Sequence, residues 1–123
     1  CAAVAWMQSE TGAQRRAFLL GLRDQFLAIL RNLPRGNGGV FGAGLEAVSL
    51  SKCSEIRGAI VPVFAGHADR AVHWSEALEA AGFWVPAIRY PTVARGAARL
   101  RVTLTAAHTL EAVVRLGDAL ARL

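Results

Sequence analysis

Lysine, cysteine and long apolar runs are scarce in this chain, and each scarcity narrows the functions open to it. Lys52 is the only lysine, so arginine carries nearly all of the positive charge. No apolar run approaches the roughly 18 residues that a membrane-spanning helix needs. Arginines interrupt the most hydrophobic segment, at positions 15, 16, 23 and 31. We therefore expect no membrane partner.

The two cysteines, Cys1 and Cys53, have no motif spacing between them. We expect two reduced thiols in a cytoplasmic protein, with a disulfide or a shared metal ion as the alternative. We expect no signal peptide or transit-like leader in this chain. It begins abruptly inside a helical pattern, so we expect a domain of a longer polypeptide.

Positive charge and apolar content are both high for a chain of 123 residues. The net charge is +5, a balance that permits nucleic-acid binding. However, the arginines are scattered and no aromatic ladder accompanies them, so we expect no nucleic-acid partner. Hydrophobic residues make up 54% of the chain. The length suits one ordinary domain, and we expect another domain or subunit to cover its surplus apolar surface.

Residues 1–33 have the spacing of an amphipathic helix, which Pro34 would end. A break near Gly12 is expected, since glycine weakens a helix. The apolar residues that recur at steps of three and four are Phe18, Leu22, Phe26, Ile29 or Leu30, and Leu33. We predict that this segment links the chain to a domain outside it.

Residues 34–57 begin with the glycine-rich stretch PRGNGGVFGAG. The stretch matches neither the GxxxxGK[ST] phosphate loop nor a strand–GxGxxG–helix arrangement. We predict a connector over residues 34–57.

Residues 58–123 alternate between strand and helix patterns and predict one α+β domain. We expect a three- to four-stranded, mainly antiparallel sheet with helices on one face. Strands are predicted over 58–66, 83–90 and 99–105, and Pro62 should lie at a sheet edge or bulge. Helices are predicted over 69–81, with inward residues Ala71, Trp74, Leu78 and Ala81, and after Thr109, with apolar residues Leu110, Val113, Val114, Leu120 and Leu123.

Local signals mark the ends of both helices. Gly82 suits the left-handed position that follows a helix, with Phe83 as the hydrophobic residue after it. Thr109 suits the N-cap of the last helix, and Glu111 lies in its first turn.

Arg99 and Arg101 are the most unusual residues in a predicted strand. Strand side chains alternate between faces, so both arginines should lie opposite Leu100 and Val102, roughly 7 Å apart at their Cα atoms. A carboxylate or other anion near them would relieve their repulsion, because arginine presents a planar fork of donors. A solvated sheet face, or arginines paired with acidic neighbours, is the alternative.

The stretch VPAIRYPTVARGAARLRVTLTAAHT, residues 85–109, resembles the C-terminal signature of the α-oxoamine synthases. These are pyridoxal-phosphate enzymes of aminotransferase-like fold, and within them the stretch is most similar to the 8-amino-7-oxononanoate synthases. The upstream stretch IVPVFAGHADRAVHWSEALEAAGFWV also fits their pattern. The resemblance is good from about Ile60 to the C-terminus and weak over residues 1–33.

The resemblance implies a fold-type I small domain and an acyltransferase reaction. The intact enzyme would be a cytoplasmic homodimer that condenses L-alanine with a pimeloyl thioester in biotin biosynthesis, using pyridoxal 5′-phosphate. The family's substrate-carboxylate arginine falls on Arg101. Thr92 matches a position near the cofactor phosphate, reached from the neighbouring subunit. Arg99 and His108 match family positions without assigned chemistry, and we expect a packing or hydrogen-bonding role for His108.

The chain departs from the family pattern at several points. Tyr90 and Ala94 replace prolines, His67 replaces an aspartate, and the connector is longer than usual. The lysine that holds the cofactor belongs to the family's large domain. Lys52, in SLSKCSE, lacks the aspartate and histidine partners of that lysine, so we assign it no cofactor role.

The isolated chain is therefore expected to bind no cofactor and to have no catalytic residue, because the lysine that holds the cofactor belongs to the absent N-terminal domain. That cofactor-binding domain is the partner we expect for this chain. The alternative is a stand-alone, non-catalytic interaction module that has kept this fold.

Overall fold

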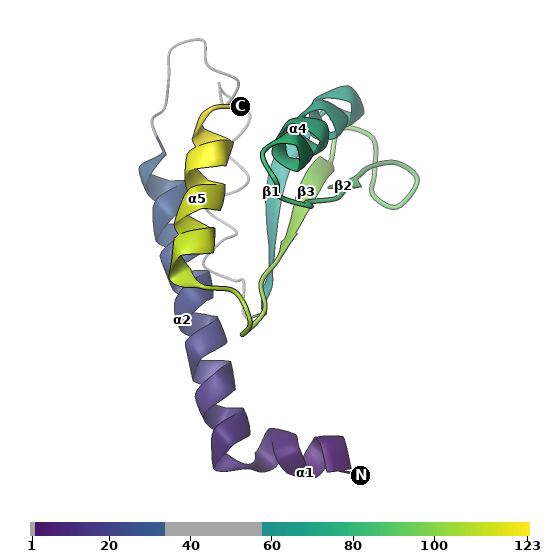
Figure 1. The fold of residues 1–123 in the computed structure, drawn as a ribbon. Helices are drawn as coiled ribbons and strands as arrows, with labels where there is room; N and C mark the ends of the chain where they lie inside the picture. The colour runs from purple at the N-terminus through teal and green to yellow at the C-terminus, as the bar shows by residue number, and fades with distance from the viewer. Residues whose placement is uncertain (1, 34–57) are drawn as a thin grey trace.

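The computed structural model describes residues 2–33 and 58–123, and the predicted connector, Lys52 and both cysteines lie outside these residues. Within the described ranges the helices are α1 (Ala2–Gln8), α2 (Glu10–Asn32), α4 (Ala68–Ala80) and α5 (Leu110–Ala121). The strands are β1 (Ile60–Gly66), β2 (Ala87–Ile88) and β3 (Ala98–Thr103). The predicted α+β class is confirmed (Figure 1).

The three described strands form an antiparallel sheet in the order β1–β3–β2. Pro62 lies on β1, at the edge of these strands, as predicted for a residue without a backbone donor. The register shifts between Phe64 and Gly66, which marks a bulge. The strand predicted over 83–90 is wrong in length, since only Ala87–Ile88 pairs with β3. Pro86, which has no N–H, precedes it.

The N-terminal helices meet at Ser9, three residues from the break predicted near Gly12. The Ser9 hydroxyl accepts a hydrogen bond from the Gly12 amide at 3.2 Å and so caps α2. A Cβ on Gly12 would collide with the carbonyl oxygens of Trp6 and Met7. Glycine is thus required where α1 turns away from α2.

One apolar cluster joins α2, α4 and α5 to a single face of the sheet. That face carries the alternate residues Val61, Val63, Ala65, Ala98, Leu100 and Val102, all of them buried. Leu22, Phe26 and Leu30 of α2 are buried as predicted, but Phe18 is 50% exposed. Figure 1 shows the reason: α2 lies along α5 and then runs past its N-terminal end.

The turn after α4 sets the direction of the chain toward the site described below. Gly82 has φ +88°, and Phe83 donates its amide hydrogen to the carbonyl oxygen of Leu78 at 2.8 Å. This is the predicted left-handed termination. Of the predicted inward residues of α4, Ala71, Trp74 and Leu78 are buried, whereas Ala81 is exposed.

The last helix begins as predicted, because the Thr109 hydroxyl accepts from the Ala112 amide at 3.2 Å. Its buried residues are Val113, Leu116, Gly117 and Leu120. The predicted apolar side was wrong at Leu110 and Val114, which are exposed. Among the described helices, none combines the length and apolarity that crossing a membrane requires.

Candidate functional site

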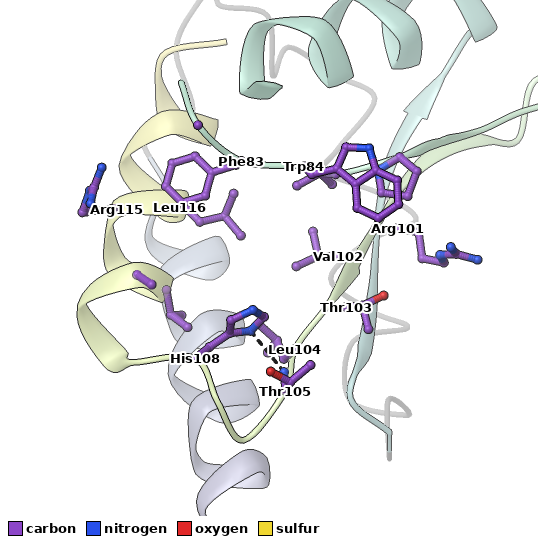
Figure 2. A pocket seen from close by; sticks show the side chains of 15 residues that line it. Phe83, Trp84, Arg101, Val102, Thr103, Leu104, Thr105, His108, Arg115 and Leu116 are labelled. Carbon is purple, nitrogen blue, oxygen red and sulfur yellow. Dashed lines mark hydrogen bonds between the residues drawn. The ribbon is translucent and has the colours of Figure 1, made fainter. Parts of the chain in front are cut away.

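A cleft of about 620 Å³ opens where β3, α5 and the segment after α4 come together. Residues 82–86 form one wall, the second half of β3 and the turn that follows it form another, and α5 closes the third (Figure 2). The Ser75 hydroxyl holds the first wall against α4 by donating to the carbonyl oxygen of Val85 at 2.6 Å. The cleft therefore has one wall of extended chain tied to α4, one of strand and turn, and one of helix.

Arg101 lies at the margin of this cleft. Its backbone is fixed in β3, where it faces Pro62 of β1 and donates to the carbonyl oxygen of Pro86 at 3.0 Å. Its side chain is exposed, and no hydrogen bond or ion pair joins it to a described residue. Figure 2 shows its guanidinium pointing away from α5. The predicted alternation holds, since Leu100 and Val102 are buried on the opposite face.

Arg99 shares this sheet face but has a structural partner. Its guanidinium carbon lies 4.3 Å from the centre of the Phe64 ring. Its Nε donates to the carbonyl oxygen of Ala97 at 2.9 Å. Arg99 does not line the cleft, so the structure does not bring the two arginines together around one anion site, and Arg101 is the one that faces open space there.

Thr92 lies in the turn between β2 and β3, away from the residues that line the cleft. The turn follows a cis peptide bond between Tyr90 and Pro91, and the Thr92 amide donates to the carbonyl oxygen of Arg89 at 3.0 Å. Its side chain is exposed. Arg101 and Thr92 are thus not parts of one site within this chain.

His108 contributes to the cleft through a hydrogen-bonded turn. Its Nδ1 accepts a hydrogen bond from the Thr105 amide at 3.1 Å, which confirms the expected hydrogen-bonding role (Figure 2). Because Nδ1 is the acceptor, the neutral ring carries its proton on Nε2. His67 and His73 are exposed elsewhere, and the described residues contain no cluster of His, Cys, Asp or Glu that could hold a metal ion.

Sequence reasoning missed the aromatic wall of the cleft. Trp84 is 83% exposed, an unusual state for so large an apolar side chain. Phe83 is half-buried, and the guanidinium carbon of Arg115 lies 5.9 Å from its ring centre. The sequence did contain a signal for this wall, since two aromatic residues directly follow Gly82. Gly82 ends α4 and turns the chain back along that helix.

Comparison with known proteins agrees with the resemblance that the sequence motifs carry. No protein-family model matches the chain. The 8-amino-7-oxononanoate synthase of Hydrogenovibrio crunogenus is 55% identical over 64 residues, which are 52% of this chain and 16% of that protein. The enzymes of the same name from Pseudescherichia vulneris and Enterobacter sp. are 38% and 36% identical over 119 residues, or 97% of this chain.

The chain spans only 27% of the length of these last two relatives. The matches nevertheless extend beyond the segments whose motifs carried the resemblance, since they include most of residues 1–57. The chain is therefore identified as a relative of the C-terminal domain of the α-oxoamine synthases, most like 8-amino-7-oxononanoate synthase.

Proposed function

We propose that this chain is the C-terminal domain of an acyltransferase that condenses L-alanine with a pimeloyl thioester. The reaction releases carbon dioxide and the thiol and forms 8-amino-7-oxononanoate, a step toward biotin. The names of the relatives support this activity. The observation that carries the proposal is the exposed Arg101 guanidinium, which lies at the edge of a cleft without an acidic partner among the described residues.

Arg101 would bind and orient the α-carboxylate of the amino-acid substrate. A guanidinium offers two parallel N–H donors to one carboxylate, which fixes the orientation of the acid as well as its position. The strand supports this role, because the Arg101 backbone is hydrogen-bonded within the sheet and cannot shift alone. A group held by rigid elements orients a substrate better than one on a loop.

The described residues do not by themselves make a pyridoxal-phosphate site. They include no lysine, and Thr92 lies outside the cleft that Arg101 lines. When bound in the intact enzyme, this cofactor would supply the electron-accepting chemistry. We propose that the rest of the polypeptide provides the cofactor site, and that Thr92 reaches it across a homodimer interface. The complete enzyme would work in the cytoplasm.

A chimera tests the role of Arg101. The segment of the Pseudescherichia vulneris synthase that matches this chain is replaced by residues 1–123, and formation of 8-amino-7-oxononanoate from L-alanine is measured. Arg101→Ala should lower kcat/KM for L-alanine, since it removes one partner of a charged pair. The decrease should correspond to a loss of roughly 2–4 kcal/mol of transition-state stabilisation. Arg99→Ala is the matched control and should leave kcat/KM within about threefold.

Two results would contradict this assignment. One is an active chimera whose KM and kcat for L-alanine are unchanged by Arg101→Ala. The other is an equal loss in the Arg99→Ala chimera, which would point to damage of the sheet. If the parent chimera is inactive although it binds pyridoxal phosphate, the chain does not supply a functional C-terminal domain.

A stand-alone interaction module is the second candidate, and the exposed apolar residues favour it. Trp6, Phe18 and Trp84 are each at least 49% exposed, as large contact residues of a partner-binding surface would be. The gene discriminates between the two functions. An upstream reading frame that encodes the large domain supports the enzyme, whereas a start codon directly before Cys1 with no such frame supports the module.

A further inference from the structure

The turn between β2 and β3 is held by two separate sets of backbone hydrogen bonds. In its first half, the amides of Thr92 and Val93 donate to the carbonyl oxygen of Arg89 at 3.0 and 3.3 Å. In its second half, the Ala97 amide donates to the carbonyl oxygen of Ala94 at 3.1 Å. Each of these bonds joins near neighbours in the chain, so neither set fixes one half of the turn against the other.

One side-chain contact does join the two halves. The guanidinium carbon of Arg95, in the second half, lies 4.7 Å from the centre of the Tyr90 ring, in the first half. A cation at this distance is attracted to the face of an aromatic ring. Within the described part of the chain, no acidic residue forms an ion pair with Arg95. The Tyr90 ring is therefore the group that fixes this guanidinium.

Packing against the core does not set the positions of these side chains. Figure 1 shows the turn extending beyond β2, away from α2 and α5. Tyr90 is 59% exposed, and Thr92 and Arg95 are exposed as well. An exposed turn with few buried contacts opens easily unless local contacts hold it. The contact between Tyr90 and Arg95 spans Thr92 in the chain, so it holds the segment on both sides of that residue.

We propose that Tyr90 and Arg95 are positioning residues, which hold the turn in the conformation that presents the Thr92 hydroxyl to a phosphate group. This inference rests on the proposed function, in which Thr92 reaches the cofactor phosphate across a homodimer interface. A hydroxyl that is already oriented binds without the cost of ordering the turn. This chain has Tyr90 and Ala94 where the family pattern has prolines, so a side-chain contact takes over the stiffening that proline rings provide.

The first experiment uses the chimera described above in its cofactor-free form. Kd is measured by fluorescence for pyridoxal 5′-phosphate and for pyridoxal, which lacks the phosphate, so that the ratio of the two values isolates the phosphate contact. Thr92→Val sets the full size of the effect. It should weaken pyridoxal-phosphate binding about tenfold, because a hydrogen bond to a charged group is lost, and leave pyridoxal binding unchanged.

Tyr90→Ala and Arg95→Ala should each weaken pyridoxal-phosphate binding about two- to fivefold, which is what an exposed contact of this kind contributes. Neither should change the Kd for pyridoxal. The double variant should lose no more than either single variant, because both remove the same contact. Tyr90→Phe keeps the ring and should bind as the parent does. Arg115→Ala is the matched control, since Arg115 lies over the Phe83 ring at 5.9 Å, outside this turn.

The possible results separate this inference from the proposed function. An unchanged Kd ratio in Thr92→Val would mean that Thr92 does not meet the phosphate, and both would fail. A changed ratio in Thr92→Val but not in Tyr90→Ala would overturn this inference alone. A loss in Arg95→Ala that persists in full beside Tyr90→Ala would also overturn it, because Arg95 would then act through its charge and not through the ring.

The second experiment examines the contact in the 123-residue chain without any cofactor. An aromatic ring shields protons that lie over its face, so the Arg95 side-chain protons should resonate upfield in the nuclear magnetic resonance spectrum. Tyr90→Ala should return them to the positions of an exposed arginine, and Tyr90→Phe should keep the shift. Arginine protons that do not respond to Tyr90→Ala would show that the contact does not hold the turn, whatever the chimera binds.

Discussion

Arg99 and Arg101 occupy the same face of one strand and yet meet different surroundings. The alternation of the sequence predicted their shared face, because strand periodicity is local. It could not predict that Arg99 faces Phe64 across the sheet, since this pairing depends on the register of β1 against β3. The alternation alone therefore did not distinguish the two arginines; the family resemblance pointed to Arg101, and the strand pairing shows that Arg99 has a structural partner.

The difference predicts opposite effects on stability. Arg99→Ala should lower the free energy of unfolding by about 1 kcal/mol, because it removes the contact with Phe64 and the hydrogen bond to Ala97. Arg101→Ala should change it by less than about 0.5 kcal/mol, as expected for an exposed residue without a partner. Urea denaturation measures both. A larger loss in Arg101→Ala would show that Arg101 is structural.

Helix α5 shows what periodicity predicts and where it stops at the scale of an element. Thr109 and the apolar spacing predicted where the helix begins. They also predicted the buried Val113 and Leu120, but not that Leu110 and Val114 would stay exposed, because that depends on α2, which lies far earlier in the chain. Gly117 is buried against Ile29 of α2, whereas Leu110 and Val114 remain exposed. The closest approach of α2 to α5 thus lies at a glycine, beside the buried Val113, Leu116 and Leu120.

Two glycine substitutions test this contact. A Cβ on Gly117 would collide with Cγ2 of Ile29, so Gly117→Ala should lower the free energy of unfolding by about 1–3 kcal/mol. Gly21 is exposed within α2 and has open space around it, so Gly21→Ala should raise stability by up to about 1 kcal/mol. Thermal denaturation compares them. A stabilised Gly117→Ala would mean that α2 and α5 are not packed this closely.

At the scale of the molecule, the α+β class and most element ends followed from the sequence, but the shape of the cleft did not. Its walls come from three separate segments, 82–86, 101–108 and 112–116, whose proximity depends on the tertiary fold. The predicted surplus of apolar surface is visible at Trp6, Phe18 and Trp84. Exposed apolar side chains of this size fit a surface that another domain or subunit covers.

At the same scale, the 123-residue chain should not bind pyridoxal phosphate covalently. Lys52 is its only lysine, and a stable imine requires a site that also grips the ring and the phosphate. Mixed with pyridoxal phosphate, the chain should show no more imine absorbance than equimolar N-acetyl-lysine.

The amino terminus is acetylated for this test, because the amine and thiol of Cys1 together react with aldehydes. Borohydride reduction and peptide mass spectrometry locate any adduct, with Lys52→Arg as the control. A saturable one-to-one adduct on Lys52, absent from Lys52→Arg, would contradict the prediction and give this chain a cofactor site of its own.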